Sequence, residues 1–184
     1  MKGFVYASCW VTVLVVIAPL VSSAQTGADD LKIVAGERVG PVSLTMSIDD
    51  VLKLLGTPSN VERTSASAIY EWRPRFLKIF QSLNTGEISS IRTIWVFGQI
   101  NSYRTENGLG VGASEDQAKQ SHGGGGCFQQ GGATWREYWW PEGGIHYVIN
   151  TSSSAPQAIQ YKVSEIGVRR RSTSVPRSPW RPCG

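Results

Sequence analysis

The sequence predicts an α+β fold in which two helix-plus-antiparallel-strand repeats share one antiparallel sheet and pack their helices on one face of it. Two observations lead to this prediction. The chain matches itself at an offset of 67 residues, and each matching unit has one short capped helix followed by apolar segments with a period of two. The aligned identities are Ile33 with Ile100, Ser47 with Ser114, Asp49 with Asp116, Gly56 with Gly123, Trp72 with Trp139 and Pro74 with Pro141. We therefore expect a first unit at residues 31–97 and a second at residues 98–168.

Residues 1–24 have the pattern of a cleavable secretory signal peptide. Lys2 supplies a positive charge, Phe4 to Leu20 is an almost unbroken apolar run, and Val21 to Ala24 ends on small residues suited to cleavage. The apolar run is short for a bilayer span, which needs roughly 20 residues. We expect a mature chain that is periplasmic or secreted and has no transmembrane segment.

Each unit is expected to have a leading extended segment, then one helix, then three antiparallel strands. Ser47 to Asp50 forms a capping-box pattern, the next apolar residues have helical spacing, and Gly56 is suited to end the helix, which predicts a helix at 48–55. Ser114 to Gln117 repeats this pattern, with a weaker apolar stripe after it. Three strands are expected after each helix, at 68–72, 76–81 and 88–97 in the first unit and at 135–140, 145–149 and 159–163 in the second.

The first unit resembles a class of exported bacterial domains in the segments Val42–Ser47, Asp50–Leu52 and Leu55–Pro58. This class includes the small outer-membrane-assembly lipoprotein (SmpA/OmlA) domain and the tandem-repeat β-lactamase-inhibitor-protein fold. The resemblance implies short helices packed on an antiparallel sheet, and a binding module in place of an enzyme.

The charge distribution separates a body from a tail. Residues 25–168 hold 12 basic and 14 acidic residues, whereas five arginines and no carboxylate lie in residues 169–184. A mildly acidic body argues against a nucleic-acid-binding protein. The tail lacks apolar periodicity, so we expect it to be disordered, with weak contact to an anionic surface as one alternative and no partner as the other.

Aromatic side chains are the candidate binding residues. Trp139 and Trp140 are neighbours in an expected strand, so they point to opposite faces of the sheet. Either one ring is exposed for recognition, or loops cover it. The candidate binding residues are Trp72, Trp135, Tyr138, Trp139 and Trp140.

The cysteines and histidines offer competing interpretations. Cys127 and Cys183 remain after signal cleavage and are either a disulfide or two free thiols. Cys127 with His122 would be the pair of a thiol-dependent hydrolase, but the four glycines at 123–126 between them favour a flexible loop. The histidines and cysteines have no recognised metal-ligand spacing.

The sequence therefore predicts an exported, non-enzymatic binding protein without a metal or cofactor. It would engage a protein or a cell-envelope partner through one face of its sheet. The alternatives are an exported thiol-dependent hydrolase that uses Cys127 and His122, and an envelope tether that acts through the Arg-rich tail.

Overall fold

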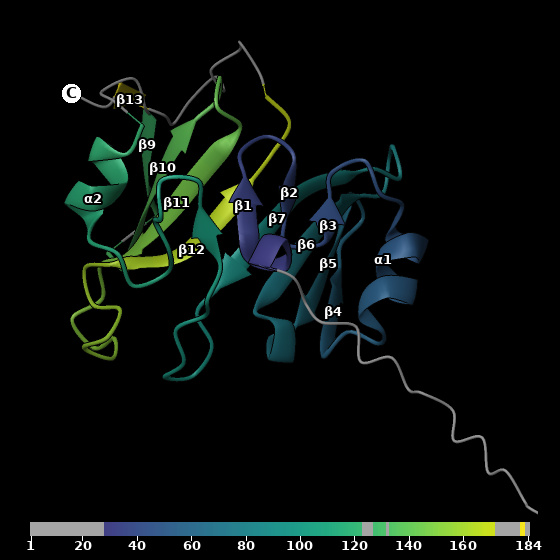
Figure 1. Cartoon of the computed structure of the whole chain (residues 1–184), viewed down its shortest axis with the longest axis horizontal. Helices are drawn as coiled ribbons and strands as arrows, with labels where there is room; N and C mark the ends of the chain where they lie inside the picture. Colours follow the sequence, from purple (N-terminus) through teal and green to yellow (C-terminus); the bar gives the residue numbers. More distant parts are fainter. Residues whose placement is uncertain (1–27, 123–126, 132, 172–180, 183–184) are drawn as a thin grey trace, which may run out of the picture.

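The computed structural model describes residues 28–122, 127–131, 133–171 and 181–182. Its main element is a nine-stranded antiparallel sheet with the order β13-β9-β10-β11-β12-β7-β6-β5-β4 (Figure 1). The strands are β4 (Asn60–Arg63), β5 (Ser67–Trp72), β6 (Leu77–Ser82), β7 (Ile88–Ile94), β9 (Cys127–Gly131), β10 (Trp135–Trp140), β11 (Ile145–Asn150), β12 (Val163–Val168) and β13 (Arg181–Pro182).

Two meanders meet in the middle of this sheet. Strands β4 to β7 run from one edge inward, and strands β9 to β12 run inward from the other side. The two meanders join where β12 pairs with β7, with Glu165 opposite Ile94 and Val168 opposite Ile91. This pairing makes one continuous sheet from segments far apart in the sequence.

A small second sheet and two helices lie on one side of the large sheet. The small sheet has the order β3-β2-β1-β8 and is formed by β1 (Lys32–Val34), β2 (Arg38–Val39), β3 (Val42–Ser43) and β8 (Arg104–Thr105). In Figure 1 it lies between α2 (Glu115–Gln120), at the β9 end, and α1 (Ile48–Leu55), at the β4 end. Strand β2 contacts the central strands β7 and β12. Short 3₁₀ helices occupy Ala28–Leu31 and Arg73–Arg75.

The hydrophobic core fills the space between the two sheets. Strand residues alternate between faces, and every second residue of β5 and of β11 is in the core cluster, as are Tyr138 and Trp140 of β10. The strand residues concerned are Ala68, Tyr70, Trp72, Leu77, Ile79, Ile88, Ile91, Tyr138, Trp140, Ile145, Tyr147, Ile149, Val163, Ile166 and Val168. The other face of the large sheet is therefore free to carry polar side chains.

The predicted fold class is wrong. The protein is mostly β, and its helices are not the layer that covers the sheet. The helices are too short for that role: α1 has eight residues and α2 six, and each contributes one fully buried side chain, Val51 and Ala118. The small sheet covers the centre instead, and it forms from short segments that the hydrophobic pattern does not mark as strands.

Several local predictions are confirmed. The helix at 48–55 and the capping box of the second helix are present, and the hairpins β5–β6 and β10–β11 lie within one residue of their expected positions. The expected strand at 159–163 is wrong, because β12 begins only at Val163. Strands β4 and β9 were not expected.

Two predicted segments fall largely outside the described residues. The signal peptide at 1–24 lies outside them, and so does most of the tail, of which Arg169–Arg171 and β13 are described. In the part of the chain that the structure describes, no helix has the length and apolar character needed to cross a bilayer.

Candidate binding face of the sheet

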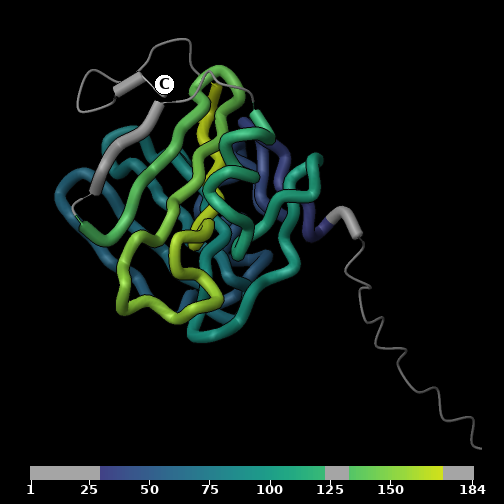
Figure 2. The backbone as a smooth tube through the Cα atoms, turned by 90° about the vertical axis from the view of Figure 1, so that its left-hand side faces the viewer, coloured from purple at the N-terminus to yellow at the C-terminus, as the bar shows by residue number. Residues whose placement is uncertain are grey.

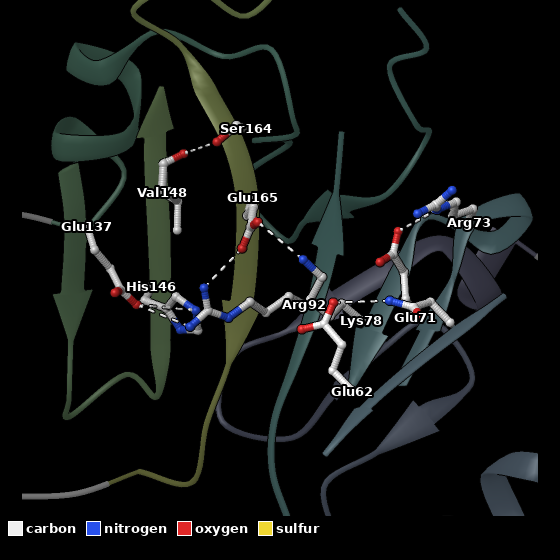
Figure 3. A network of polar contacts seen from close by, with 11 residues as sticks. Glu62, Glu71, Arg73, Lys78, Arg92, Glu137, His146, Val148, Ser164 and Glu165 are labelled. Carbon is white, nitrogen blue, oxygen red and sulfur yellow. Dashed lines mark hydrogen bonds and ion pairs between the residues drawn. The ribbon is translucent and has the colours of Figure 1, made fainter. Parts of the chain in front are cut away.

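Charged residues gather on the face of the large sheet that points away from the core. They occupy the positions that alternate with core residues: Lys78 on β6, Arg92 on β7, Glu165 on β12, and Glu137 on β10. Figure 3 shows Arg92 reaching from β7 past β12 toward Glu137 and His146. Residues from both meanders therefore build one polar network.

Arg92 is the centre of this network. Its Nη1 donates to Glu165 Oε2 at 3.0 Å, and its Nη2 lies 3.6 Å from Glu137 Oε1. The guanidinium also lies over the Phe80 ring, 4.7 Å from the ring centroid. Lys78 adds a second cation 3.9 Å from Glu165 Oε1. Because Arg92 is only 14% exposed, its planar group is held in a fixed orientation by these contacts.

Glu137 and His146 form the buried end of the network. Three nitrogens approach Glu137 Oε1: Arg92 Nη2 and His146 Nε2 at 3.6 Å, and Arg169 Nη2 at 3.8 Å. None of these contacts is a hydrogen bond, and among the described residues Glu137 Oε1 and both His146 ring nitrogens have no hydrogen-bond partner. Complete burial, with a smaller effect of the Arg92 and Arg169 charges, holds the pKa of His146 well below its usual range. The imidazole is therefore neutral at physiological pH.

Gly167 makes room for the His146 ring. The two residues are opposite each other in the β11–β12 pair. A Cβ on Gly167 would lie 2.0 Å from His146 Cε1 and 2.2 Å from His146 Nε2, so any side chain there would force the imidazole or the backbone to shift. The absence of a side chain at Gly167 thus leaves the space that the imidazole occupies beside β12.

A hollow of about 520 Å³ opens beside the network. Two carboxylates, one guanidinium and one indole line it, together with amide and hydroxyl groups. Its lining residues are Arg92, Thr134, Trp135, Glu137, Val148, Asn150, Ser152, Ser164 and Glu165. Its volume is in the range of pockets that hold a small ligand or an inserted side chain, about 300–1,000 Å³.

The structure separates the five aromatic candidates. Trp72, Tyr138 and Trp140 are in the hydrophobic core. Trp139 points to the opposite face, as its position next to Trp140 predicts, but it is buried, with the Arg169 guanidinium 5.8 Å from its ring centroid. Of the five, Trp135 alone lines the hollow, and it is half-buried.

The groups of the thiol-enzyme interpretation are in a different place. The His122 ring is hydrogen-bonded through Nε2 to the Tyr147 hydroxyl, and it packs 5.2 Å from the Trp140 ring. Burial lowers the pKa of His122. Cys127 begins β9, with Pro182 opposite it, but its side chain and Cys183 lie outside the described residues. In the described part of the chain, no cluster of three or more His, Cys, Asp or Glu side chains could hold a metal ion.

Sequence reasoning did not identify Arg92, Glu137 or Glu165, and it considered His146 only as a metal ligand. A usable signal was present, since each of these polar residues interrupts a strand rich in apolar and aromatic residues. A polar residue at alternate positions marks one face of a sheet, but its partners on neighbouring strands depend on the register. The grouping of all four residues required the strand order.

No protein-family model, curated protein or solved structure matches this chain.

Proposed function

We propose that this chain is an exported, non-enzymatic binding protein. It holds a protein partner against the face of its nine-stranded sheet that points away from the core, which we call the open face. The observation that carries the proposal is the polar hollow centred on Arg92, Glu137 and Glu165. These charges are paired with one another and held in place by burial, which is how recognition surfaces fix the register of a partner.

The size of the face suits a protein partner. Nine strands at about 4.8 Å spacing span roughly 40 Å, and strands of about six residues span roughly 20 Å. The face of the sheet therefore has an area of roughly 800 Å², which is about the area that each partner buries in a standard protein interface. Trp135 at the edge of the hollow is the residue type that most often anchors such an interface.

The test is affinity capture from the native host with the immobilised mature chain. We expect the immobilised wild-type chain to capture at least one host protein. The Trp135→Ala variant should capture at least tenfold less of that protein. Leu54→Ala is the matched control, because Leu54 is an exposed apolar side chain on α1, away from the open face. Equal yields of the same proteins from wild type and Trp135→Ala would refute the proposed docking face.

A further inference from the structure

The three most exposed large apolar side chains of the described residues lie at one end of the molecule. Phe97 is 81% exposed, Tyr161 55% and Ile100 48%. Phe97 and Ile100 belong to the loop 95–103, between β7 and β8, and Tyr161 belongs to the loop 151–162, between β11 and β12. Figures 1 and 2 both show these two loops side by side at the lower end of the molecule. We call them the aromatic loops.

Backbone contacts connect the aromatic loops to each other and to the hollow. Gly112 packs against Ile100, and its N–H donates to Val163 O at 2.8 Å, two residues beyond Tyr161. The Trp95 N–H donates to Ser164 O at 2.8 Å, and Ser164 lines the hollow. The Tyr161 N–H also donates to the backbone carbonyl oxygen of Asn150, at 2.8 Å, and Asn150 lines the hollow as well. The loops therefore border the hollow.

Both exposed aromatic residues have an unfavourable backbone conformation. Phe97 has a φ of 29° and Tyr161 a φ of 55°, and Phe76 is the only other non-glycine with a positive φ in the described residues. Phe76 packs against the core, which offsets its strain. Phe97 and Gly98 both have positive φ in a turn closed by the Gln99 N–H to Val96 O bond, where asparagine or glycine is the usual choice. A bulky exposed side chain at such a position indicates a function for that side chain.

The aromatic loops are almost without charge. Residues 95–103 contain no charged residue, and residues 151–162 contain only Lys162. Aromatic enrichment with few charges is the composition of the central part of protein–protein interfaces, whereas the rim is polar. The chemistry therefore favours a folded protein whose facing surface is apolar and uncharged.

We propose that Phe97 and Tyr161 are the anchor residues of the docking surface and insert into apolar depressions on the partner protein, beside the polar hollow. This inference rests on the proposed function, because the aromatic loops and the hollow form one surface. The partner carries an uncharged apolar patch opposite the loops and polar groups opposite Arg92, Glu137 and Glu165.

Photocross-linking of the full chain in its native host tests the proposal. Benzoylphenylalanine is placed at position 97, 161 or 135, with position 83 as a control because Leu83 is exposed on a different loop. We expect positions 97, 161 and 135 to give an adduct with one and the same protein, and position 83 to give none. Adducts from position 135 alone would overturn the anchor assignment and leave the proposed function intact. Absence of adducts at all three positions would overturn both.

The contribution of each anchor residue to binding is then measured with asparagine variants and the partner identified by cross-linking. Phe97→Asn and Tyr161→Asn remove the ring and introduce a residue that tolerates positive φ. We expect each variant to bind the partner at least tenfold more weakly and to melt at or above the wild-type temperature, whereas Leu83→Asn binds normally. Unchanged binding would overturn the proposal. Two other outcomes would also overturn the proposal. If the wild-type chain floats with vesicles of equal parts phosphatidylglycerol and phosphatidylcholine and the asparagine variants do not, the loops bind a membrane surface. If the adducts have twice the mass of the chain, the loops bind a second copy of it.

Discussion

At the scale of single residues, the contact between Gly167 and His146 decides how the open face is built. The imidazole occupies the volume that a side chain at position 167 would need. It is also fully buried among Glu137, Arg92 and Arg169, so it has little freedom to move away. The polar network therefore depends on a residue that carries no polar side chain.

We expect Gly167→Ala to lower the free energy of unfolding by about 2 kcal/mol, the typical cost of overpacking a buried site. Urea denaturation measures this change. Gly143→Ala is the control, because a Cβ there would make only ordinary contacts of 3.6 Å or longer. In a His146→Ala background the same glycine change should cost clearly less. Equal costs in both backgrounds would show that the ring is not the obstacle.

His146 also predicts a pH dependence of stability. Because its pKa in the folded state is below the ordinary value of 6.5, the unfolded chain takes up the proton first as the pH falls. The stability contribution is thus complete above about pH 6.5 and decreases below it, by up to about 1.4 kcal/mol per pH unit for one proton. Urea midpoints between pH 7.5 and 5 measure this slope, which should be smaller in His146→Gln.

His122 provides the comparison for this measurement. Burial also lowers its pKa, so His122→Asn should remove a separate part of the same slope. An unchanged slope in His146→Gln, together with a flat profile in His122→Asn, would assign the whole effect to His122.

At the scale of elements, both helix starts and the end of α1 at Leu55 agree with prediction, whereas the backbone conformation of Gly56 does not. Ser47 and Ser114 each accept a hydrogen bond from the third helical N–H, at 3.1 Å, because capping depends on residues within one turn. Gly56 ends α1 with a φ of 77° but a ψ of −160°, which is outside the left-handed helical region that local rules suggest. The Trp72 indole donates to Gly56 O at 2.9 Å, so a distant strand helps to set this ending.

Gly56→Ala should therefore destabilise the protein by about 1 kcal/mol through backbone strain alone, since a Cβ would meet no atom within 4 Å. The urea midpoint at constant m-value reports the change. Lys53→Ala, an exposed substitution in the last turn of α1, should leave the midpoint within error. A normal midpoint for Gly56→Ala would mean that this glycine does not need its positive φ.

Strands with strong local signals were predictable, whereas those defined by pairing were not. The segments that form β10 and β11 have aromatic and β-branched residues and a Pro-Glu-Gly-Gly turn between them. Strand β4 has three exposed residues and is a strand only because β5 lies beside it. In the candidate site, Trp135 was found because tryptophan is a common anchor residue. The network around Arg92 was not, because its partners come from strands β10 and β12.

At the scale of the whole molecule, the core is shared between the two meanders. The small sheet joins β1, near the start of the described chain, to β8 by a parallel pairing, and β2 contacts both β7 and β12. A fragment of residues 31–97 would lose β8, β12 and every partner that they provide. It would expose the edge of β7 that pairs with β12 and the edge of β1 that pairs with β8.

We expect this fragment to be unfolded or partly folded as a monomer, because fewer than about 70 residues without a disulfide or metal rarely bury enough apolar surface. Differential scanning calorimetry of the fragment and of residues 25–184 is the measurement. A cooperative transition of the monomeric fragment at the wild-type temperature would show that the first meander is an independent domain.

The seam between β7 and β12 has a consequence for the rate of folding. Hairpins such as β5–β6 and β10–β11 close loops of a few residues and form within microseconds. The hydrogen bond from Arg92 to Glu165 joins residues 73 positions apart. Its closure carries a larger entropic cost, which has to be met before the two meanders stabilise each other. The seam therefore controls the height of the folding barrier, and until it closes each meander has an unprotected inner edge that can pair with the same edge of another molecule.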